Sequence, residues 1–108
     1  MSKAEYWQRG ESLDYTNTTE QKIEANTIVS FGSRVGVVGT PLLPRETGSI
    51  LVTGVFEMPK SSGNAIDMGT TVYFDGEGIT EEEGEVVAGY AVRAAEATDT
   101  VILVKLLG

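Results

Sequence analysis

The sequence is divided into short runs of β-branched and aromatic residues, separated every few positions by Gly, Pro, Asn or Asp. Runs of this length, bounded by turn-forming residues, are typical of β-strands, and the pattern contains no long amphipathic helix. Thirteen glycines are scattered without a period, which suits a chain with many turns. The pattern predicts an all-β fold, a small antiparallel β-barrel or sandwich of about seven strands. The expected strands cover Ser12–Thr16, residues 27–31, Arg34–Val38, and residues 47–58, 70–74, 85–93 and 100–107.

The connections between these runs differ in character. Residues 32–33 are short enough to join a hairpin, and Gly54 interrupts the longest run, which predicts a bulge or a bend there. Residues 75–84 form a long acidic connection. Residues 19–26 and 94–97 are compatible with either a loop or a single helical turn.

The last predicted strand is apolar on both faces. Val101, Leu103 and Leu107 alternate with Ile102, Val104 and Leu106, and only Lys105 interrupts them. A strand of this kind is buried on both faces, either within its domain or under a neighbouring subunit. We therefore predict that a subunit interface includes four apolar residues, Val101, Leu103, Leu106 and Leu107.

Residues 1–10 are predicted to form an N-terminal arm preceding a single β domain over residues 11–108. The arm is polar except for Tyr6 and Trp7, the latter being the one tryptophan of the chain. Two interpretations stay open: these aromatic side chains pack back onto the domain, or they anchor the arm on a partner. We expect no signal peptide in the arm, and no apolar run approaches the ~20 residues of a membrane span.

The chain contains neither cysteine nor histidine. Disulfides, thiolate nucleophiles and cysteine-based zinc sites are excluded, and the commonest general base is missing. Sixteen acidic and eight basic residues give a net charge of −8, which repels nucleic acid and anionic membranes. We predict no enzyme activity, no catalytic residues, no cofactor, and no nucleic-acid or membrane partner.

Two local patterns resemble binding motifs but fail on inspection. Lys60 and Ser61 follow Pro59, which lacks the N–H that a phosphate-binding loop requires, so an ATP site is rejected. The acidic stretch from Asp75 to Glu85 does not match a calcium-binding loop. We interpret it as a solvated hairpin loop and predict no metal site, leaving open whether it binds a cation.

The chain resembles a widespread family of small phage and prophage proteins, the capsid cement or head decoration proteins. The most specific matching strings are Gly-Val-Phe-Glu-Met-Pro-Lys over residues 54–60 and Val-Tyr-Phe-Asp over residues 72–75. Further matches follow one another along the chain: Tyr6-Trp7, Gly10, residues 13–17, Ile23 to Val29, residues 35–37, residues 46–48, Gly69 and residues 89–91. Some relatives carry an older recombinase label, which this chain does not support because it lacks an ATP-binding loop and basic DNA-binding residues.

The resemblance implies an all-β protein on the outer capsid surface, binding the major capsid protein as a homo-oligomer, with a trimer favoured. It implies a location in the virion, after assembly in the bacterial cytoplasm, and it supplies no catalytic residues. Our hypothesis is that Tyr6 and Trp7 anchor the arm on the capsid. The alternative is a structural or connector protein of the phage tail or baseplate, which would use the same kind of β surface.

Overall fold

The computed structural model describes residues 2–107, and that part of the chain contains nine strands and no helix. Their bounds are β1 Ser12–Thr16, β2 Ile28–Phe31, β3 Arg34–Val38, β4 Thr47–Leu51, β5 Val55–Pro59, β6 Thr71–Phe74, β7 Ile79–Thr80, β8 Val87–Ala91 and β9 Val101–Leu106. The all-β prediction is confirmed. Among the described residues there is accordingly no helix long and apolar enough to cross a membrane.

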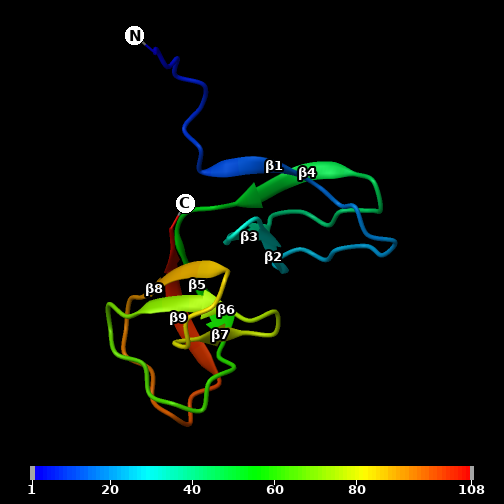
Figure 1. Cartoon of the computed structure of the whole chain (residues 1–108). Coiled ribbons are helices and arrows are strands. Elements are labelled where there is room, and N and C mark those ends of the chain that lie inside the picture. The colour runs from blue at the N-terminus through cyan, green and yellow to red at the C-terminus, as the bar shows by residue number, and fades with distance from the viewer. Residues whose placement is uncertain (1, 108) are drawn as a thin grey trace.

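All nine strands belong to one curled sheet that forms a half-barrel. The order β1-β4-β3-β8-β6-β7 forms its main path, with β2 paired to β3, and β5 paired to β9, which also pairs with β8. The strand pairings are antiparallel except between β3 and β8. Figure 1 shows β1–β4 and β5–β9 as two parts, here called the N-terminal half (residues 11–54) and the C-terminal half (residues 55–107).

The strand number exceeds the predicted seven for two reasons. The run over residues 47–58 divides into β4 and β5, because the chain turns sharply at Gly54, where φ is +110°. Only glycine adopts such a backbone conformation at low cost, so the predicted bend becomes a complete break between strands. The second addition is β7, whose residue Ile79 is fully buried within the connection that the sequence indicated as a solvated loop.

Two hydrophobic clusters share strand β3. Val35 and Val37 pack into the cluster of the C-terminal half, whereas Val38 packs into the cluster of the N-terminal half with Leu42 and Ile50. Gly36 lies against Ile50, whose Cδ1 would be 2.8 Å from an added Cβ. Strand β3 is therefore buried on both faces and joins the two halves through side-chain packing as well as through hydrogen bonds.

The C-terminal half curls until β5 and β7, the strands at the two ends of its sheet order β5-β9-β8-β6-β7, approach one another. At the end of β5, Lys60 forms a parallel bridge with Ile79 of β7, and the Ser61 N–H donates to the Ile79 carbonyl at 2.9 Å. Gly78 makes this approach possible, because an added Cβ would lie 2.8 Å from the Pro59 carbonyl oxygen. We call this contact between residues 59–62 and 78–81 the seam.

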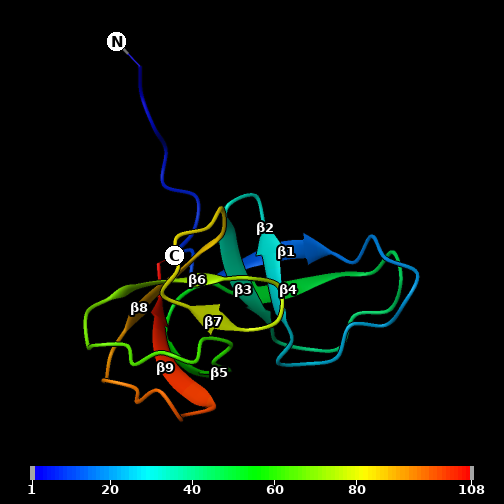
Figure 2. The same ribbon diagram turned by 60° about the horizontal axis from the view of Figure 1, so that its bottom comes forward.

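The loops 17–26 and 39–46 run side by side and extend from the N-terminal half, as Figures 1 and 2 both show. Asn17 organises them, and its side chain is fully buried. The Asn17 amide donates to the carbonyls of Gln21 and Leu42, and its side-chain oxygen accepts two hydrogen bonds from Thr19. Residues 19–26 and 94–97, for which either a loop or a single helical turn was expected, form turns and bends without a helix.

Candidate functional site

The N-terminal arm extends away from the sheet, and its two aromatic side chains face solvent. Tyr6 is 76% exposed and Trp7 is 90% exposed, so neither packs back onto the domain. The arm, residues 2–10, has no regular secondary structure. The arm contacts β1 and the residue before it through a Gln8 Nε2 hydrogen bond to the Ser12 carbonyl and a weak Arg9–Glu11 ion pair at 3.9 Å. Figure 1 shows it projecting beyond β1.

The two apolar faces of strand β9 have different environments, one in the core and the other at the surface. Ile102, Val104 and Leu106 point into the core and are at most 3% exposed, whereas Val101 is 45% exposed on the opposite face. The register pairs Val101 with Pro59 and Leu103 with Glu57 of β5. The outer face of β5 and β9 is therefore an apolar surface with few charges. It consists of Val55, Glu57, Pro59, Val101, Leu103 and Lys105.

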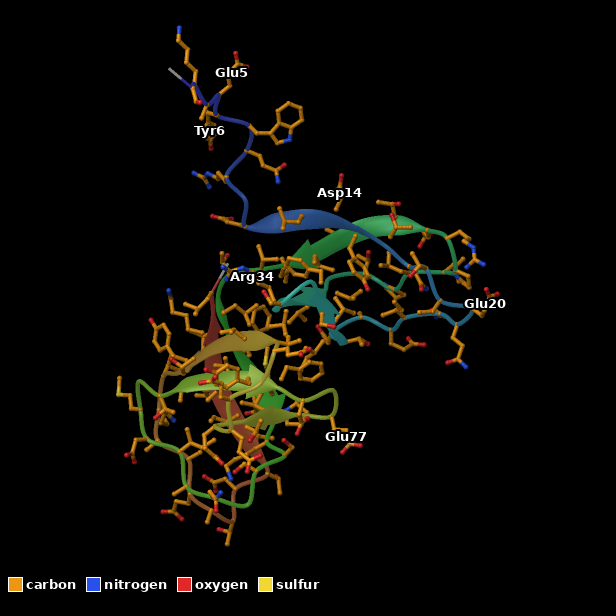
Figure 3. All side chains as sticks on the ribbon, in the orientation of Figure 1. Glu5, Tyr6, Asp14, Glu20, Arg34 and Glu77 are labelled. Atoms are coloured by element: carbon orange, nitrogen blue, oxygen red, sulfur yellow. The ribbon has the colours of Figure 1, made fainter. Side chains whose placement is uncertain are left out.

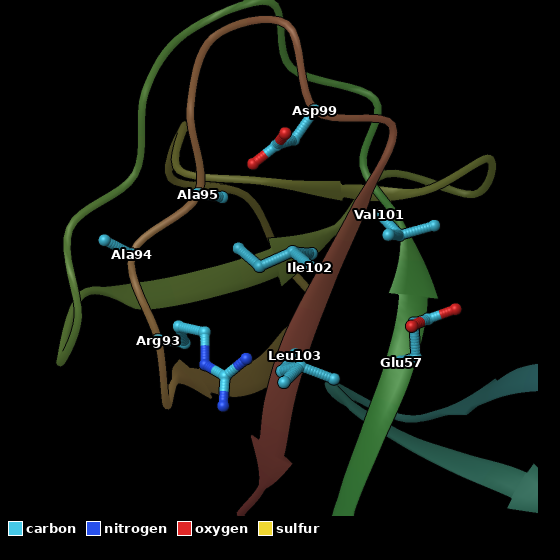
Figure 4. A pocket seen from close by; sticks show the side chains of 8 residues that line it. All are labelled: Glu57, Arg93, Ala94, Ala95, Asp99, Val101, Ile102 and Leu103. Atoms are coloured by element: carbon cyan, nitrogen blue, oxygen red, sulfur yellow. The ribbon is translucent and has the colours of Figure 1, made fainter.

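The outer face of β5 and β9 contains a shallow depression of about 200 Å³ next to the loop after β8. Figure 4 shows the guanidinium of Arg93 beside Leu103, with Asp99 at the far end and Glu57 on the neighbouring strand. Both signs of charge surround an apolar floor. Such an open depression suits a side chain of a neighbouring protein better than it suits an enclosed ligand.

The structure separates the four residues predicted at a subunit interface. Val101 and Leu107 are 45% and 41% exposed and Leu103 is half-buried, so all three side chains are accessible. Leu106 is a correction to the prediction, because it is 3% exposed and packs in the core of its own chain. Alternation along β9 decides this outcome, since Leu106 shares a face with Ile102 and Val104.

The seam joins the end of the first string that carried the family resemblance, residues 54–60, to the segment that follows the second string, residues 72–75. Lys60 is only 8% exposed, and its Nζ donates to the Ser62 carbonyl at 2.6 Å. The Ser61 hydroxyl donates to Asp75 at 2.7 Å, and the Ser62 hydroxyl donates to both oxygens of Glu81 at 2.7 Å. Lys60, which the sequence does not support as a phosphate ligand, thus fixes the turn that follows β5. Sequence reasoning missed this role, although the position of Lys60 at the end of the first string was a signal.

Hydrogen bonds to the carboxylates of the seam lower their pKa values. The Ser61 hydroxyl, followed by the backbone N–H groups of Glu77 and Gly78, lowers the pKa of Asp75. The Ser62 hydroxyl lowers the pKa of Glu81, with smaller effects from Asn64 and the nearby positive charge of Lys60. These donors favour the ionised carboxylates. They serve the loop's own structure, and within residues 2–107 no three His, Cys, Asp or Glu side chains are placed to hold a metal ion.

Comparison with known proteins supplies the remaining observation. A family model described as phage cement protein matches residues 7–106, which is nearly the whole chain. The chain belongs to the phage cement protein family. No curated protein and no solved structure matches it.

Membership of the cement protein family identifies the chain as a phage capsid cement protein and associates it with the virion. The family match favours a structural role over catalysis. The matched range begins at Trp7 and ends at Leu106, so it includes one arm aromatic and all nine strands. The exposed surfaces of the chain, rather than an enclosed pocket, are therefore the candidate functional site.

Proposed function

We propose that the chain binds the outer surface of the phage head, contacts the major capsid protein across subunit boundaries, and stabilises the assembled shell. The observation that carries the proposal is the family match over residues 7–106. The exposed Tyr6 and Trp7 support it, because large aromatic side chains on an extended arm suit insertion into a partner. Assembly of the protein in the bacterial cytoplasm before it joins the head is part of the proposal.

The stabilisation follows from selective binding to one state. A protein that binds the assembled lattice and not the separated subunits shifts the equilibrium toward the lattice. At a free concentration one hundred times its dissociation constant, this shift is about 2.7 kcal/mol per site. Many copies bridging many boundaries add their contributions across the shell.

We further propose that the chain is a homo-oligomer, with a trimer favoured, and that the outer face of β5 and β9 forms the contact between copies. Three accessible apolar residues support this surface, Val101, Leu103 and Leu107. Val55 extends it, because it is 53% exposed and lies opposite Lys105 in the register. Leu106 is not part of the surface, since it lies in the core.

The arm hypothesis is tested by binding to purified heads. The Tyr6→Ala/Trp7→Ala double variant should fold normally, because neither side chain packs on the sheet, and should lose binding to expanded heads. The Lys3→Ala variant is a matched control, since it changes an arm residue without removing an aromatic ring. Wild-type binding by the double variant would refute the anchoring role of Tyr6 and Trp7.

The location is tested by electron microscopy of phage particles that carry the protein. Density over the head surface, with binding to expanded heads exceeding binding to immature ones, is the expected result. Density confined to the tail or baseplate would instead establish the alternative function as a tail component. Heads that lack the protein should rupture at lower temperature or lower osmotic stress than heads that contain it.

A further inference from the structure

The charge of the chain is distributed unevenly over the structure. The arm carries Lys3, Arg9 and one carboxylate, a net charge of +1. The N-terminal half carries three basic and five acidic side chains, a net charge of −2, and the C-terminal half carries three basic and ten acidic side chains, a net charge of −7. Most of the net negative charge of the chain, −7 of −8, therefore lies on the half that is remote from the arm.

The outer face of β1 and β4 has the opposite character. Its side chains alternate with Leu13, Tyr15 and Ile50, which point inward to the cluster of the N-terminal half. The face presents mostly small hydroxyl side chains, and the Thr16 and Thr47 hydroxyls lie 2.6 Å apart across the two strands. Its members are Ser12, Asp14, Thr16, Thr47, Ser49 and Leu51.

The arm and the outer face of β1 and β4 lie on the same side of the molecule. Figure 3 shows Asp14 projecting toward the side on which Glu5 and Tyr6 of the arm lie, whereas Glu77 of the acidic half lies at the far side. Leu51 is 39% exposed and pairs with Ser12, so it places an apolar side chain beside the base of the arm. The face and the arm are thus continuous.

We propose that the outer face of β1 and β4 lies against the capsid together with the arm, and that the acidic C-terminal half points into solvent. This proposal rests on the proposed function and adds the orientation of the bound molecule. The ten carboxylates of the C-terminal half outnumber its three basic side chains, so burial of its acidic loops would desolvate unpaired charges, whereas the face of β1 and β4 buries one carboxylate, Asp14. Short hydroxyl side chains also lose little rotamer entropy on binding.

The proposal fixes the chemistry of the partner surface. It is a flat and mainly uncharged protein surface that exchanges hydrogen bonds with hydroxyl groups, rather than a basic patch that attracts an acidic protein. Binding should therefore fall by less than about threefold between about 50 mM and about 300 mM salt. Contact through the acidic half would instead require a basic capsid surface, and binding would weaken steeply with salt.

The absence of cysteine from the sequence allows a direct test. Single-cysteine variants Ser49→Cys, on the face of β1 and β4, and Glu83→Cys, in the acidic half, are labelled with a maleimide in the free protein and on expanded heads. Both positions are exposed in the chain. On heads, labelling of the Ser49→Cys variant should slow by at least about tenfold, and labelling of the Glu83→Cys variant should be unchanged.

Each alternative outcome of the labelling has a definite meaning. Protection of the Glu83→Cys variant with free labelling of the Ser49→Cys variant would overturn the orientation while leaving head binding intact. Protection of the Ser49→Cys variant in the absence of heads would assign this face to contacts between copies, which also overturns the proposal. Failure of the wild-type chain to bind heads would refute the proposed function itself, and binding of the wild type is measured first for that reason.

Discussion

Gly89 in the middle of β8 allows the sharpest test of the fold. Strand β8 lies between β6 and β9, with Gly89 opposite Val72 on one side and opposite Leu106 on the other. A Cβ added at Gly89 would overlap the carbonyl oxygen of Lys105, and it would lie 2.8 Å from the carbonyl carbon of that residue. Because the obstacle is the backbone of a paired strand, rotation of a side chain cannot relieve it.

The expected cost of the Gly89→Ala substitution follows from this geometry. Overpacking a close-packed site costs about 1–3 kcal/mol, and a backbone obstacle places this site at the upper end. The lower entropy of the unfolded alanine chain returns about 0.4–1 kcal/mol. We therefore expect a net loss of about 2 kcal/mol in the free energy of unfolding, which lowers Tm by roughly 10 °C for a domain of this size.

Urea and thermal unfolding followed by circular dichroism measure this loss. Tryptophan fluorescence is a poor probe of unfolding, because Trp7 is 90% exposed in the folded chain. The matched control is Gly63→Ala, where an added Cβ meets no atom within 4 Å, and its stability should change by less than about 1 kcal/mol. Equal stability of the Gly89→Ala and Gly63→Ala variants would refute the close approach of β8 and β9.

Three further perturbations have defined outcomes. The Asn17→Ala substitution removes buried hydrogen bonds and should cost about 2–3 kcal/mol in urea unfolding, with faster amide exchange across loops 17–26 and 39–46; slow exchange there would contradict its organising role. The lowered pKa values of Asp75 and Glu81 stabilise the fold above the ordinary carboxyl range, and this contribution is lost as pH falls through the lowered values. Ser62→Ala should therefore reduce the loss of stability on acidification, and an unchanged acid profile would exclude the Ser62–Glu81 hydrogen bond as its source. Val101→Ser should leave the unfolding of the monomer within about 1 kcal/mol of the wild type while weakening self-association in analytical ultracentrifugation, and an unaltered association constant would remove this residue from the proposed contact.

Much of the fold is predictable because most strands are local runs of β-branched and apolar residues bounded by turn residues. The bounds of β1 and β3 were predicted as observed, and the inward face of residues 50, 52 and 58 follows from simple alternation. Strand β7 escaped prediction because two residues are too short for a period, and its flanking carboxylates suggest solvent. Its burial depends on the seam, a contact between segments that are about twenty residues apart.

The candidate site was less predictable than the fold. Composition and the exposed aromatics of the arm indicate a binding protein, but no local pattern states which apolar face of β9 enters the core. The assignment of Leu106 to the core depends on the pairing of β9 with both β5 and β8. The buried role of Lys60 was also hidden, since a lysine in sequence is usually read as a surface charge.

The burial of β3 between two hydrophobic clusters has a consequence for how the molecule fails under load. Loss of either cluster would expose valines of β3 to water, so neither half keeps its packing when the other half unfolds. Heating should then give one calorimetric transition with equal calorimetric and van't Hoff enthalpies. Under mechanical tension, a copy of the chain would unfold in a single step, without a partly unfolded intermediate.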